Sequence, residues 1–293
     1  MSLGETYLPA EALGKNGMGC LLTSATEAGV RLNDLPGNQW LAFTRTWFVS
    51  SDSPRRDKIA HPATFPEALV QGFLEFFTRK GDTVIDPFAG SGTTLKVAKQ
   101  LGRNSIGIEL YDSFVELSRG LIKRQKGSGK TKVLHGDCRD VLPTLGRKRI
   151  DRFDFCITSP PYWSQLSASS ERGVTRAERG LPLNYGDSAD DLGNISDYDA
   201  FLKEQKLVFD LLYDVMKPGS YLVVVTNNIY KNSRLYPLAF DTLHSLSDLW
   251  VPKDEKIWCQ NDKRLFPFGM WNSWIGNRSH HYCLIFKKEL RRV

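Results

Sequence analysis

Two short segments of the chain contain residues whose types and spacing are suited to chemistry. Residues 84–94 are Val-Ile-Asp-Pro-Phe-Ala-Gly-Ser-Gly-Thr-Thr, and residues 156–163 are Cys-Ile-Thr-Ser-Pro-Pro-Tyr-Trp. A glycine turn after an apolar strand lets a nucleoside cofactor approach the backbone, and the helix that follows offers free amides. Two adjacent prolines fix the backbone beside a hydroxyl and an aromatic ring, which suits a flat base with an exocyclic amine.

Both segments resemble motifs of S-adenosylmethionine-dependent DNA methyltransferases that modify exocyclic amines. That family carries Asp-Pro-Phe-x-Gly-x-Gly-Thr-Thr and (Asp/Asn/Ser)-Pro-Pro-(Tyr/Phe/Trp), and the chain has both in the family's order. The resemblance extends over about residues 55–290. It implies an α/β, Rossmann-like methyltransferase fold with a mostly parallel seven-stranded sheet, an antiparallel hairpin at one edge, and S-adenosylmethionine as the cofactor.

The resemblance assigns several regions to the cofactor. The glycine turn would line its methionine half, where Asp86 or a nearby acceptor would meet the ammonium group. Glu109 follows about 20 positions on, where a carboxylate can accept both ribose hydroxyls, and Asp137 takes the family position that contacts the adenine amine. A His-Pro-x-x-x-Pro segment at residues 61–66 would lie on the other side of the methionine half. The full set is His61, Pro62, Phe65, Asp86, Pro87, Phe88, Ala89, Gly90, Ser91, Gly92, Thr93, Glu109, Leu110, Asp137 and Cys138.

The second segment supplies the predicted catalytic residues, Ser159, Pro160, Pro161 and Tyr162. A duplex buries the exocyclic amine, so the enzyme must extrude the base into a pocket. There the Ser159 hydroxyl and the Pro160 carbonyl could accept hydrogen bonds from the amine while Tyr162 stacks on the ring. We expect direct in-line methyl transfer without a covalent intermediate. Methylation at carbon five would need a Cys beside a proline, and the chain has no Pro-Cys pair.

The clamp residue Ser159 also bears on the target base. In the resembling family Ser-Pro-Pro-Tyr goes mostly with cytosine and Asp-Pro-Pro-Tyr with adenine. We therefore interpret the chain as a DNA (cytosine-N4) methyltransferase, with N6-adenine methylation, RNA base methylation and a non-catalytic nucleic acid-binding module as alternatives. An oxidoreductase is disfavoured, because the turn is not Gly-x-Gly-x-x-Gly and its aspartate would repel a pyrophosphate.

The charge of the chain favours an anionic partner. Lys and Arg number 39 against 33 Asp and Glu, and residues 119–150 hold ten Lys or Arg against two Asp. Residues 260–293 hold seven Lys or Arg against two acids. Both stretches are candidates for phosphate contact, although a solvated helix face and a basic tail would have the same composition. We expect double-stranded DNA as the partner, and the resemblance allows a cognate restriction endonuclease and a homodimer.

Two loops are predicted to contact the target, near residues 164–197 and 260–280. The first holds three arginines together with five Asp or Glu between Glu171 and Asp191, so an ordinary surface insertion stays an alternative. The second mixes basic residues with Trp258, Trp271 and Trp274, and we expect at least half of these tryptophans to pack against the closing strands. The predicted nucleic-acid contacts are Arg172, Arg176, Arg179, Arg264 and Arg278.

The elements that must position these residues alternate between strands and helices. Apolar runs predict strands at 83–85, 105–110, 132–135, 153–157, 221–226, 256–259 and 281–286. Residues spaced by three and four predict helices after Pro66, after Gly92, and over 114–122, 198–216 and 238–249. This order predicts a doubly wound sheet. Residues 1–54 are interpreted as an N-terminal arm and 55–293 as the catalytic domain.

Cysteine usage and hydropathy exclude other classes. The five cysteines are far apart and form no Cys-x-x-Cys pair, so neither a disulfide framework nor a metal site is expected. Cys156 lies in a predicted strand and should be core. No basic start precedes an apolar run, and no stretch approaches the roughly 18 apolar residues of a membrane span. A cytoplasmic protein without membrane contact is expected.

Overall fold

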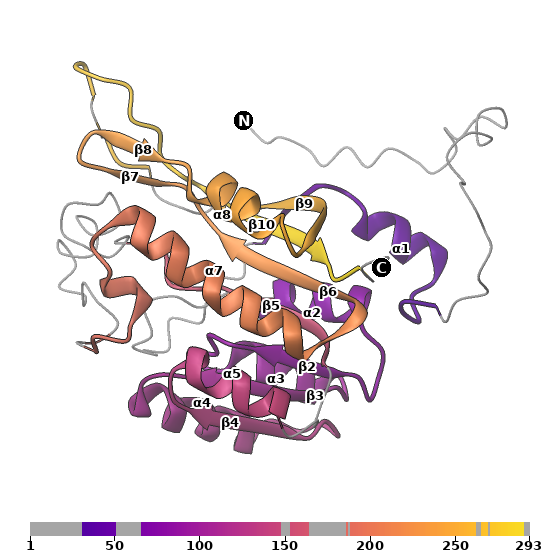
Figure 1. Cartoon of the computed structure of the whole chain (residues 1–293). Helices are drawn as coiled ribbons and strands as arrows, with labels where there is room; N and C mark the ends of the chain where they lie inside the picture. The colour runs from indigo at the N-terminus through magenta and orange to yellow at the C-terminus, as the bar shows by residue number, and fades with distance from the viewer. Residues whose placement is uncertain are drawn as a thin grey trace, which may run out of the picture. The chain divides into compact units, whose positions relative to one another are not determined.

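The structure is a computed structural model that describes residues 31–50, 66–147, 153–163, 186, 188–261, 265–268 and 270–289. Leu32–Val293 form one compact unit. Within these described ranges the main sheet has eight strands (Figure 1). Their order across the sheet is β1 (Trp47–Val49), β9 (Val251–Cys259), β10 (His280–Lys287), β6 (Met216–Thr226), β5 (Phe153–Thr158), β2 (Thr83–Asp86), β3 (Asn104–Glu109) and β4 (Thr131–His135).

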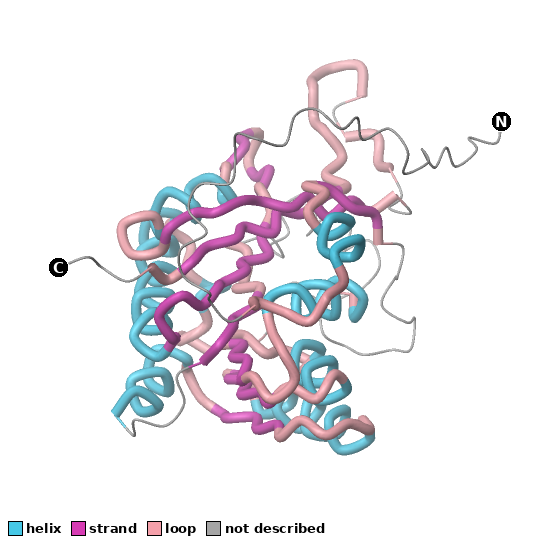
Figure 2. The backbone as a smooth tube through the Cα atoms, turned by 90° about the vertical axis from the view of Figure 1, so that its right-hand side faces the viewer, coloured by secondary structure: helices cyan, strands magenta, loops and turns pink. Residues whose placement is uncertain are grey.

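Helices cover both faces of this sheet, as the tube view shows (Figure 2). The helices are α1 (Gly37–Phe43), α2 (Glu67–Phe77), α3 (Thr93–Gln100), α4 (Asp112–Arg124), α5 (Cys138–Arg147), α7 (Tyr198–Val215), α8 (Leu238–Leu246) and the short 3-10 helix η1 (Leu192–Asn194). Helix α7 packs between α5 and α8, whereas α3 packs between α2 and α4. The chain therefore forms three layers, with the sheet in the middle.

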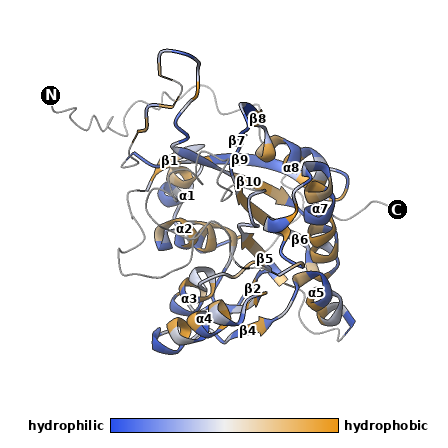
Figure 3. Ribbon diagram, turned by 90° about the vertical axis from the view of Figure 1, so that its left-hand side faces the viewer, coloured by the Kyte–Doolittle hydropathy of each residue, from blue (hydrophilic) through white to orange (hydrophobic). Residues whose placement is uncertain are grey.

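The central strands are apolar on both faces because helices cover both. In β6, Leu222 and Val224 belong to the core cluster under α7, and the alternate residues Val223 and Val225 belong to the cluster under α2. The hydropathy-coloured ribbon shows these strands as orange arrows between the layers (Figure 3). A continuous β-branched run in the sequence thus marks a strand that is buried on both sides.

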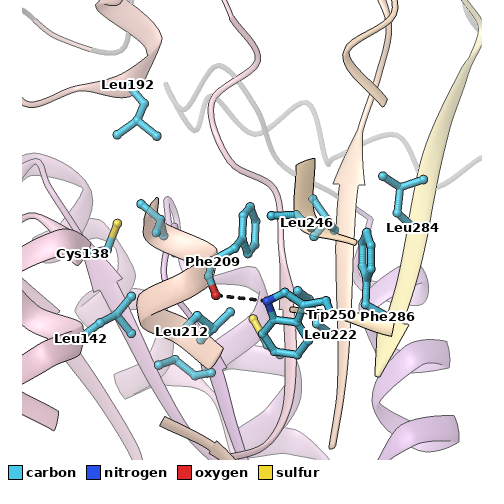
Figure 4. Close-up of a cluster of buried hydrophobic side chains, with 14 of the residues drawn as sticks. Cys138, Leu142, Leu192, Phe209, Leu212, Leu222, Leu246, Trp250, Leu284 and Phe286 are labelled. Carbon is cyan, nitrogen blue, oxygen red and sulfur yellow. Dashed lines mark hydrogen bonds between the residues drawn. The ribbon is translucent and has the colours of Figure 1, made fainter. Parts of the chain in front are cut away.

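The core cluster under α7 contains a buried tryptophan whose indole N–H is hydrogen-bonded inside the protein. Trp250 is fully buried, and its indole nitrogen donates a hydrogen bond to the Phe209 carbonyl at 3.1 Å (Figure 4). A buried indole N–H without a partner would cost the desolvation of that donor. The bond joins α7 to the start of β9.

The α/β class and the antiparallel pairing of β9 with β10 are confirmed. The strand number is one higher than the predicted seven, because β1 pairs in parallel with β9. The hairpin is consequently not at the edge of the sheet. The prediction missed β1 because three half-exposed residues show no apolar period, and pairing with a distant strand stabilises them instead.

Other elements were also missing from the sequence-based assignment. Helix α5 contains Pro143, which lowers helix propensity, and yet its Leu142 is fully buried. The β7 (Ile229–Lys231) and β8 (Arg234–Tyr236) strands form a separate two-stranded sheet. Each has only three residues, too few for a period to be recognised.

Part of the predicted N-terminal arm belongs to this unit. Phe43 of α1 stacks on Phe76 of α2 with ring centroids 4.4 Å apart, and Leu32 and Leu35 pack against the same cluster. The division at residue 54 stays a prediction, and residues 1–30 and 51–65 lie outside the described ranges. Among the described helices, none is long and apolar enough to cross a membrane.

Candidate active site

The two predicted motifs lie side by side at the carboxyl ends of neighbouring strands. Strands β2 and β5 pair in parallel, so the glycine turn after β2 and the clamp after β5 emerge at the same sheet edge. The Thr158 hydroxyl donates a 2.6 Å hydrogen bond to Asp86 Oδ1. The residue before Ser159 therefore touches the first residue of the turn.

The glycine turn is pinned to β3 by backbone amides. The Ala89 amide donates to the Ile108 carbonyl at 2.9 Å, and the Gly90 amide donates to Glu109 Oε2 at 2.8 Å. Gly92 has φ 86°, and a Cβ there would lie 2.1 Å from the Ser118 hydroxyl oxygen. Only glycine fits this position, and the turn is held in shape by the chain itself.

Glu109 has a role that the sequence analysis did not predict. Its second carboxylate oxygen, Oε1, accepts a 2.9 Å hydrogen bond from the Tyr111 amide, so each oxygen binds a backbone amide. A carboxylate offers about four acceptor positions, which leaves capacity for further donors. Contact with ribose hydroxyls stays a prediction, and positioning of the turn is an observed function of this side chain.

Asp86 and Glu109 place two buried carboxyl groups at this edge of the sheet, and no described cation pairs with either of them. Their residues are only 1% and 8% exposed, and neither side chain takes part in an ion pair in the described part of the chain. Burial raises the pKa of both carboxyls, and hydrogen bonds from Thr158 and from backbone amides oppose the rise. The negative charge of Asp86 further raises the pKa of Glu109. Such a site suits a cationic ligand and repels a pyrophosphate.

Asp137 is held by an arginine. The guanidinium of Arg139 donates to Asp137 from Nε at 2.9 Å and from Nη2 at 2.6 Å, and its Nη1 donates to Glu204 of α7. The Asp137 and Glu204 carboxylates raise the pKa of Arg139. This network fixes Asp137 at the end of β4, and its contact with a cofactor adenine stays a prediction.

The other predicted cofactor residues fall into four groups. Pro87, Ala89 and Ser91 are buried in the turn, whereas Phe88 and Thr93 are half-buried. The Cys138 side chain is buried in the core, where burial raises the pKa of its thiol. The Leu110 carbonyl lies 3.0 Å from His135 Nε2. His61, Pro62 and Phe65 lie outside the described residues.

A chain of polar groups connects the clamp to β10. The Ser159 hydroxyl donates to Tyr162 Oη at 3.2 Å, and Tyr162 Oη lies 3.1 Å from His281 Nδ1. The His281 ring stacks on Trp258 with centroids 4.8 Å apart. Pro160 is buried and Pro161 half-buried. Tyr162 is itself only 8% exposed, and its stacking on a base stays a prediction.

His281 was not singled out as a site residue. Its sequence neighbourhood has no motif, and only the antiparallel register of β10 against β9 places it opposite Trp258. The prediction that Cys156 is core is confirmed, because it is fully buried.

Trp163, the last residue of the second motif, anchors the elements around the clamp. Its ring centroid lies 4.9 Å from Tyr198 of α7 and 4.6 Å from Tyr236 of β8. The Lys231 ammonium of β7 lies 4.6 Å from the same ring, and burial lowers the pKa of this lysine. The β7–β8 hairpin is thus packed directly onto the clamp.

Of the five arginines predicted to contact the target, only Arg278 lies in the described part of the chain. Arg172, Arg176, Arg179 and Arg264 lie outside the described residues, as does most of the 164–197 loop. The Arg278 guanidinium lies 5.5 Å from the Tyr230 ring centroid. The expectation that at least half of the three tryptophans are packed was wrong, because Trp258 is buried while Trp271 and Trp274 are each 92% exposed. Periodicity could not distinguish them, since the last two belong to a loop.

A family model described as DNA methylase, of N6/N4 methyltransferases, matches residues 31–120 and 153–292. Type II methyltransferase M.BglI of Bacillus subtilis is 35% identical over 121 residues, which are 39% of this chain and 34% of the relative. Type II methyltransferase M.MjaI of Methanocaldococcus jannaschii is 44% identical over 72 residues, 24% of each chain. The alignments thus span about a quarter to a third of these relatives. Among solved structures, TrmN from Thermus thermophilus matches with TM-score 0.50 at 13% identity, over 78% of this chain and 50% of that one, which shows the fold.

Proposed function

The chain belongs to the DNA methylase family of N6/N4 methyltransferases, and from this premise we propose that it methylates the exocyclic amine of a base in double-stranded DNA. The favoured target is N4 of a cytosine that has been extruded from the duplex. The protein would act in the cytoplasm. The Type II names of M.BglI and M.MjaI support a restriction-modification role, with a cognate endonuclease as partner. In a homodimer, a second copy of the chain would share in recognition of the target sequence.

S-adenosylmethionine is the cofactor, and it supplies an electrophilic methyl group on a positively charged sulfur. The residues at the carboxyl edge fit this ligand. Asp86 and Glu109 are buried carboxylates without a described cationic partner, and the ligand brings both an ammonium and a sulfonium charge. Asp86 would hold the ammonium, and the glycine turn would enclose the methionine half.

The observation that carries the proposal is the contact between the two motifs. The 2.6 Å bond from Thr158 to Asp86 joins the start of the clamp to the turn that would receive the methyl donor. A base held by Ser159 would then meet the methyl group within one site, as a direct in-line transfer requires. Neither motif alone would imply this juxtaposition.

The polar chain behind Ser159 prepares its oxygen as an acceptor. A serine hydroxyl has one hydrogen to donate and two lone pairs. Because that hydrogen is directed to Tyr162 Oη, both lone pairs are available to the hydrogens of the amine. The Tyr162 hydrogen in turn is directed to Nδ1 of His281 when that nitrogen is unprotonated. His281 is therefore a positioning residue, and Ser159 is the catalytic residue that touches the base.

Cytosine is favoured because the clamp begins with an uncharged serine, whereas adenine-modifying relatives in the resembling group mostly carry aspartate there. N6-adenine methylation uses the same site and the same transfer step. RNA base methylation would keep both motifs and change the substrate. A non-catalytic nucleic acid-binding module would bind the cofactor without transfer, which the prearranged clamp and turn speak against.

The deciding experiment uses S-adenosylmethionine with a labelled methyl group and mixed-sequence duplex DNA, followed by digestion to nucleosides and mass analysis. We expect N4-methylcytosine. N6-methyladenine would replace the base assignment and keep the mechanism. Label on RNA with none on DNA would overturn the DNA substrate, and cofactor binding without any transfer would identify a non-catalytic module.

A further inference from the structure

Two segments beside the clamp protrude from the sheet. One is the β7–β8 hairpin, and the other, the aromatic loop, consists of the described residues of 265–278. Strand β7 begins shortly after β6 ends, and the aromatic loop leads into β10, whose second residue is His281. Both segments therefore start at the sheet edge that carries the clamp. In Figures 1 and 2 they extend beyond the sheet on the same side.

Contacts at their bases join the two segments to each other and to the clamp. The Arg278 guanidinium of the loop lies over the Tyr230 ring of β7 at 5.5 Å. Tyr236 of β8 packs on Trp163 of the clamp at 4.6 Å. The hairpin, the loop and the clamp consequently form one connected group of side chains.

Both segments have a defined shape without a partner. The hairpin closes through a two-residue turn in which Asn232 and Ser233 have φ values of 51° and 57°, the left-handed geometry of a tight hairpin. In the loop, the Asn277 side chain accepts from the Phe266 amide at 2.7 Å and donates to the Phe266 carbonyl at 2.8 Å. These bonds close the base of the loop, so its tip is presented by a fixed stem.

The tip presents apolar surface to solvent. Trp271 and Trp274 are each 92% exposed, and Met270 is 54% exposed. Two fully presented indoles in one short loop are unusual for a surface without a partner, since large apolar side chains are normally covered. This surface is therefore a candidate interface.

The charge around the tip fits a polyanion. Residues 229–236 and 265–281 contain Lys231, Arg234 and Arg278, and they contain no Asp or Glu. Arg234 is exposed at the end of the hairpin turn, where its guanidinium also lies 5.2 Å from the Tyr236 ring. Aromatic rings among cations are the composition that binds stacked bases and phosphates.

We propose that the β7–β8 hairpin and the aromatic loop hold the duplex around the extruded base, with Trp271 and Trp274 stacking on neighbouring bases and Arg234 contacting the backbone. The inference rests on the proposed DNA function and names the surface that engages the substrate. Extrusion removes stacking partners from the adjacent bases, and an inserted aromatic ring replaces them. The contacts at their bases start both segments at the sheet edge where the base would leave the helix.

The test compares Trp271→Ala/Trp274→Ala with wild type and with Trp47→Ala as the matched control. Trp47 is 52% exposed and lies on β1, the edge strand, with β9, β10 and β6 between it and β5, which leads into the clamp. Affinity for fluorescein-labelled duplex DNA is measured by polarisation, cofactor affinity by calorimetry, and fold by thermal melting. We expect the double variant to weaken DNA binding by about tenfold to a hundredfold, with cofactor affinity and Tm unchanged. Trp47→Ala should bind DNA as wild type does.

A second readout reports on the rings themselves. Duplex DNA should quench wild-type tryptophan fluorescence, and the double variant should lose most of that quenching. Arg234→Ala should reduce the salt dependence of DNA binding by about one phosphate contact. If the double variant binds DNA as tightly as wild type while wild type methylates DNA, the proposal that this surface binds the duplex is overturned. The proposed function is then unaffected. A double variant that loses self-association with unchanged DNA affinity would identify a second copy as the occupant, which also overturns the proposed duplex-binding surface.

A failure of the proposed function can be distinguished from a failure of this surface. If wild type transfers no methyl group to DNA but the double variant still loses duplex binding, the surface is supported and the proposed transfer is not.

Discussion

The glycine-turn side of the site and the proposed target-facing side are built differently. At the turn, Asp86 and Glu109 are buried and their oxygens are bound by backbone amides and by Thr158. On the other side, Trp271, Trp274 and Arg234 are presented to solvent on two protrusions. A small ligand of constant shape favours a preformed, enclosed site, whereas a long duplex stays largely outside the protein and can be contacted by groups presented at its surface. The following variants test this contrast, beginning with the clamp, where the two sides meet.

Ser159→Ala should have the largest effect, on turnover. Removing the hydroxyl takes away an acceptor for the amine, and loss of one preorganised polar contact in a transition state costs about 10²- to 10³-fold in kcat. Single-turnover methyl transfer and calorimetric cofactor titration would be measured together. Cofactor affinity should change by less than about twofold, because the proposed role of Ser159 is contact with the base and not with the cofactor. Equal losses in both quantities would refute this division of roles.

Asp86→Asn should act at the glycine turn, on cofactor affinity. Without the buried charge, S-adenosylmethionine should bind about tenfold to a hundredfold more weakly, which is the range for a hydrogen bond to a charged group. Calorimetry measures the affinity, and kcat at saturating cofactor should fall much less. Glu67→Gln is a suitable control, since Glu67 is an exposed carboxylate paired with Lys96. An unchanged cofactor affinity would exclude Asp86 from the site.

The same variant should alter the pH dependence of stability. Because burial raises the folded-state pKa of Asp86 above its ordinary 3.8, its contribution to stability is fully present below pH 3.8 and is lost as the pH rises through the raised pKa. The difference in Tm between cofactor-free Asp86→Asn and wild type should therefore grow in favour of the variant as the pH rises above 3.8. Melting curves across a pH series measure it. A constant difference would mean that the carboxyl titrates alike in both states.

Tyr162→Phe and His281→Leu should have intermediate effects on turnover. Each interrupts the polar chain that directs the Ser159 hydrogen away from the amine, and a neutral hydrogen bond corresponds to about two- to tenfold in kcat. The double variant should lose no more than the larger single loss, because both act through one chain. His280→Leu, at the preceding position of β10, is the control and should leave kcat unchanged. Additive losses would argue for two separate roles, and a rise in KM alone would argue against positioning.

Phe43→Ala should have the smallest effect on chemistry. The ring stacks on Phe76 and receives the Lys256 ammonium at 4.1 Å, which docks the 37–49 segment on the sheet. Because Phe43 is half-buried, the loss should stay below about 3 kcal/mol and lower Tm by a few degrees. Per-molecule kcat at a temperature well below Tm should match wild type. A large loss of kcat in the folded protein would instead connect this segment to the site.

Local patterns predicted much of the fold and the order of the motifs. Apolar runs gave β2, β3 and β5 nearly to their observed limits, because these strands are covered on both faces. For β6 the prediction of 221–226 covered only the buried end of a strand that begins at Met216. Segments stabilised by distant partners were not predictable. The three residues of β1 became a strand by pairing with β9, more than 200 positions away, and no local period records such a pairing.

The sequence by itself indicated the chemistry, because the glycine turn with Asp86 and the Ser-Pro-Pro-Tyr clamp are each a short contiguous segment whose backbone requirements are local. Only the tertiary structure decided which groups act together. The Thr158 to Asp86 bond spans 72 positions and the Tyr162 to His281 contact spans 119. Such contacts arise from strand order in the sheet, which depends on the packing of the whole domain. The exposure of Trp271 and Trp274 was decided in the same way, because burial is a property of neighbours in space and not of residue type.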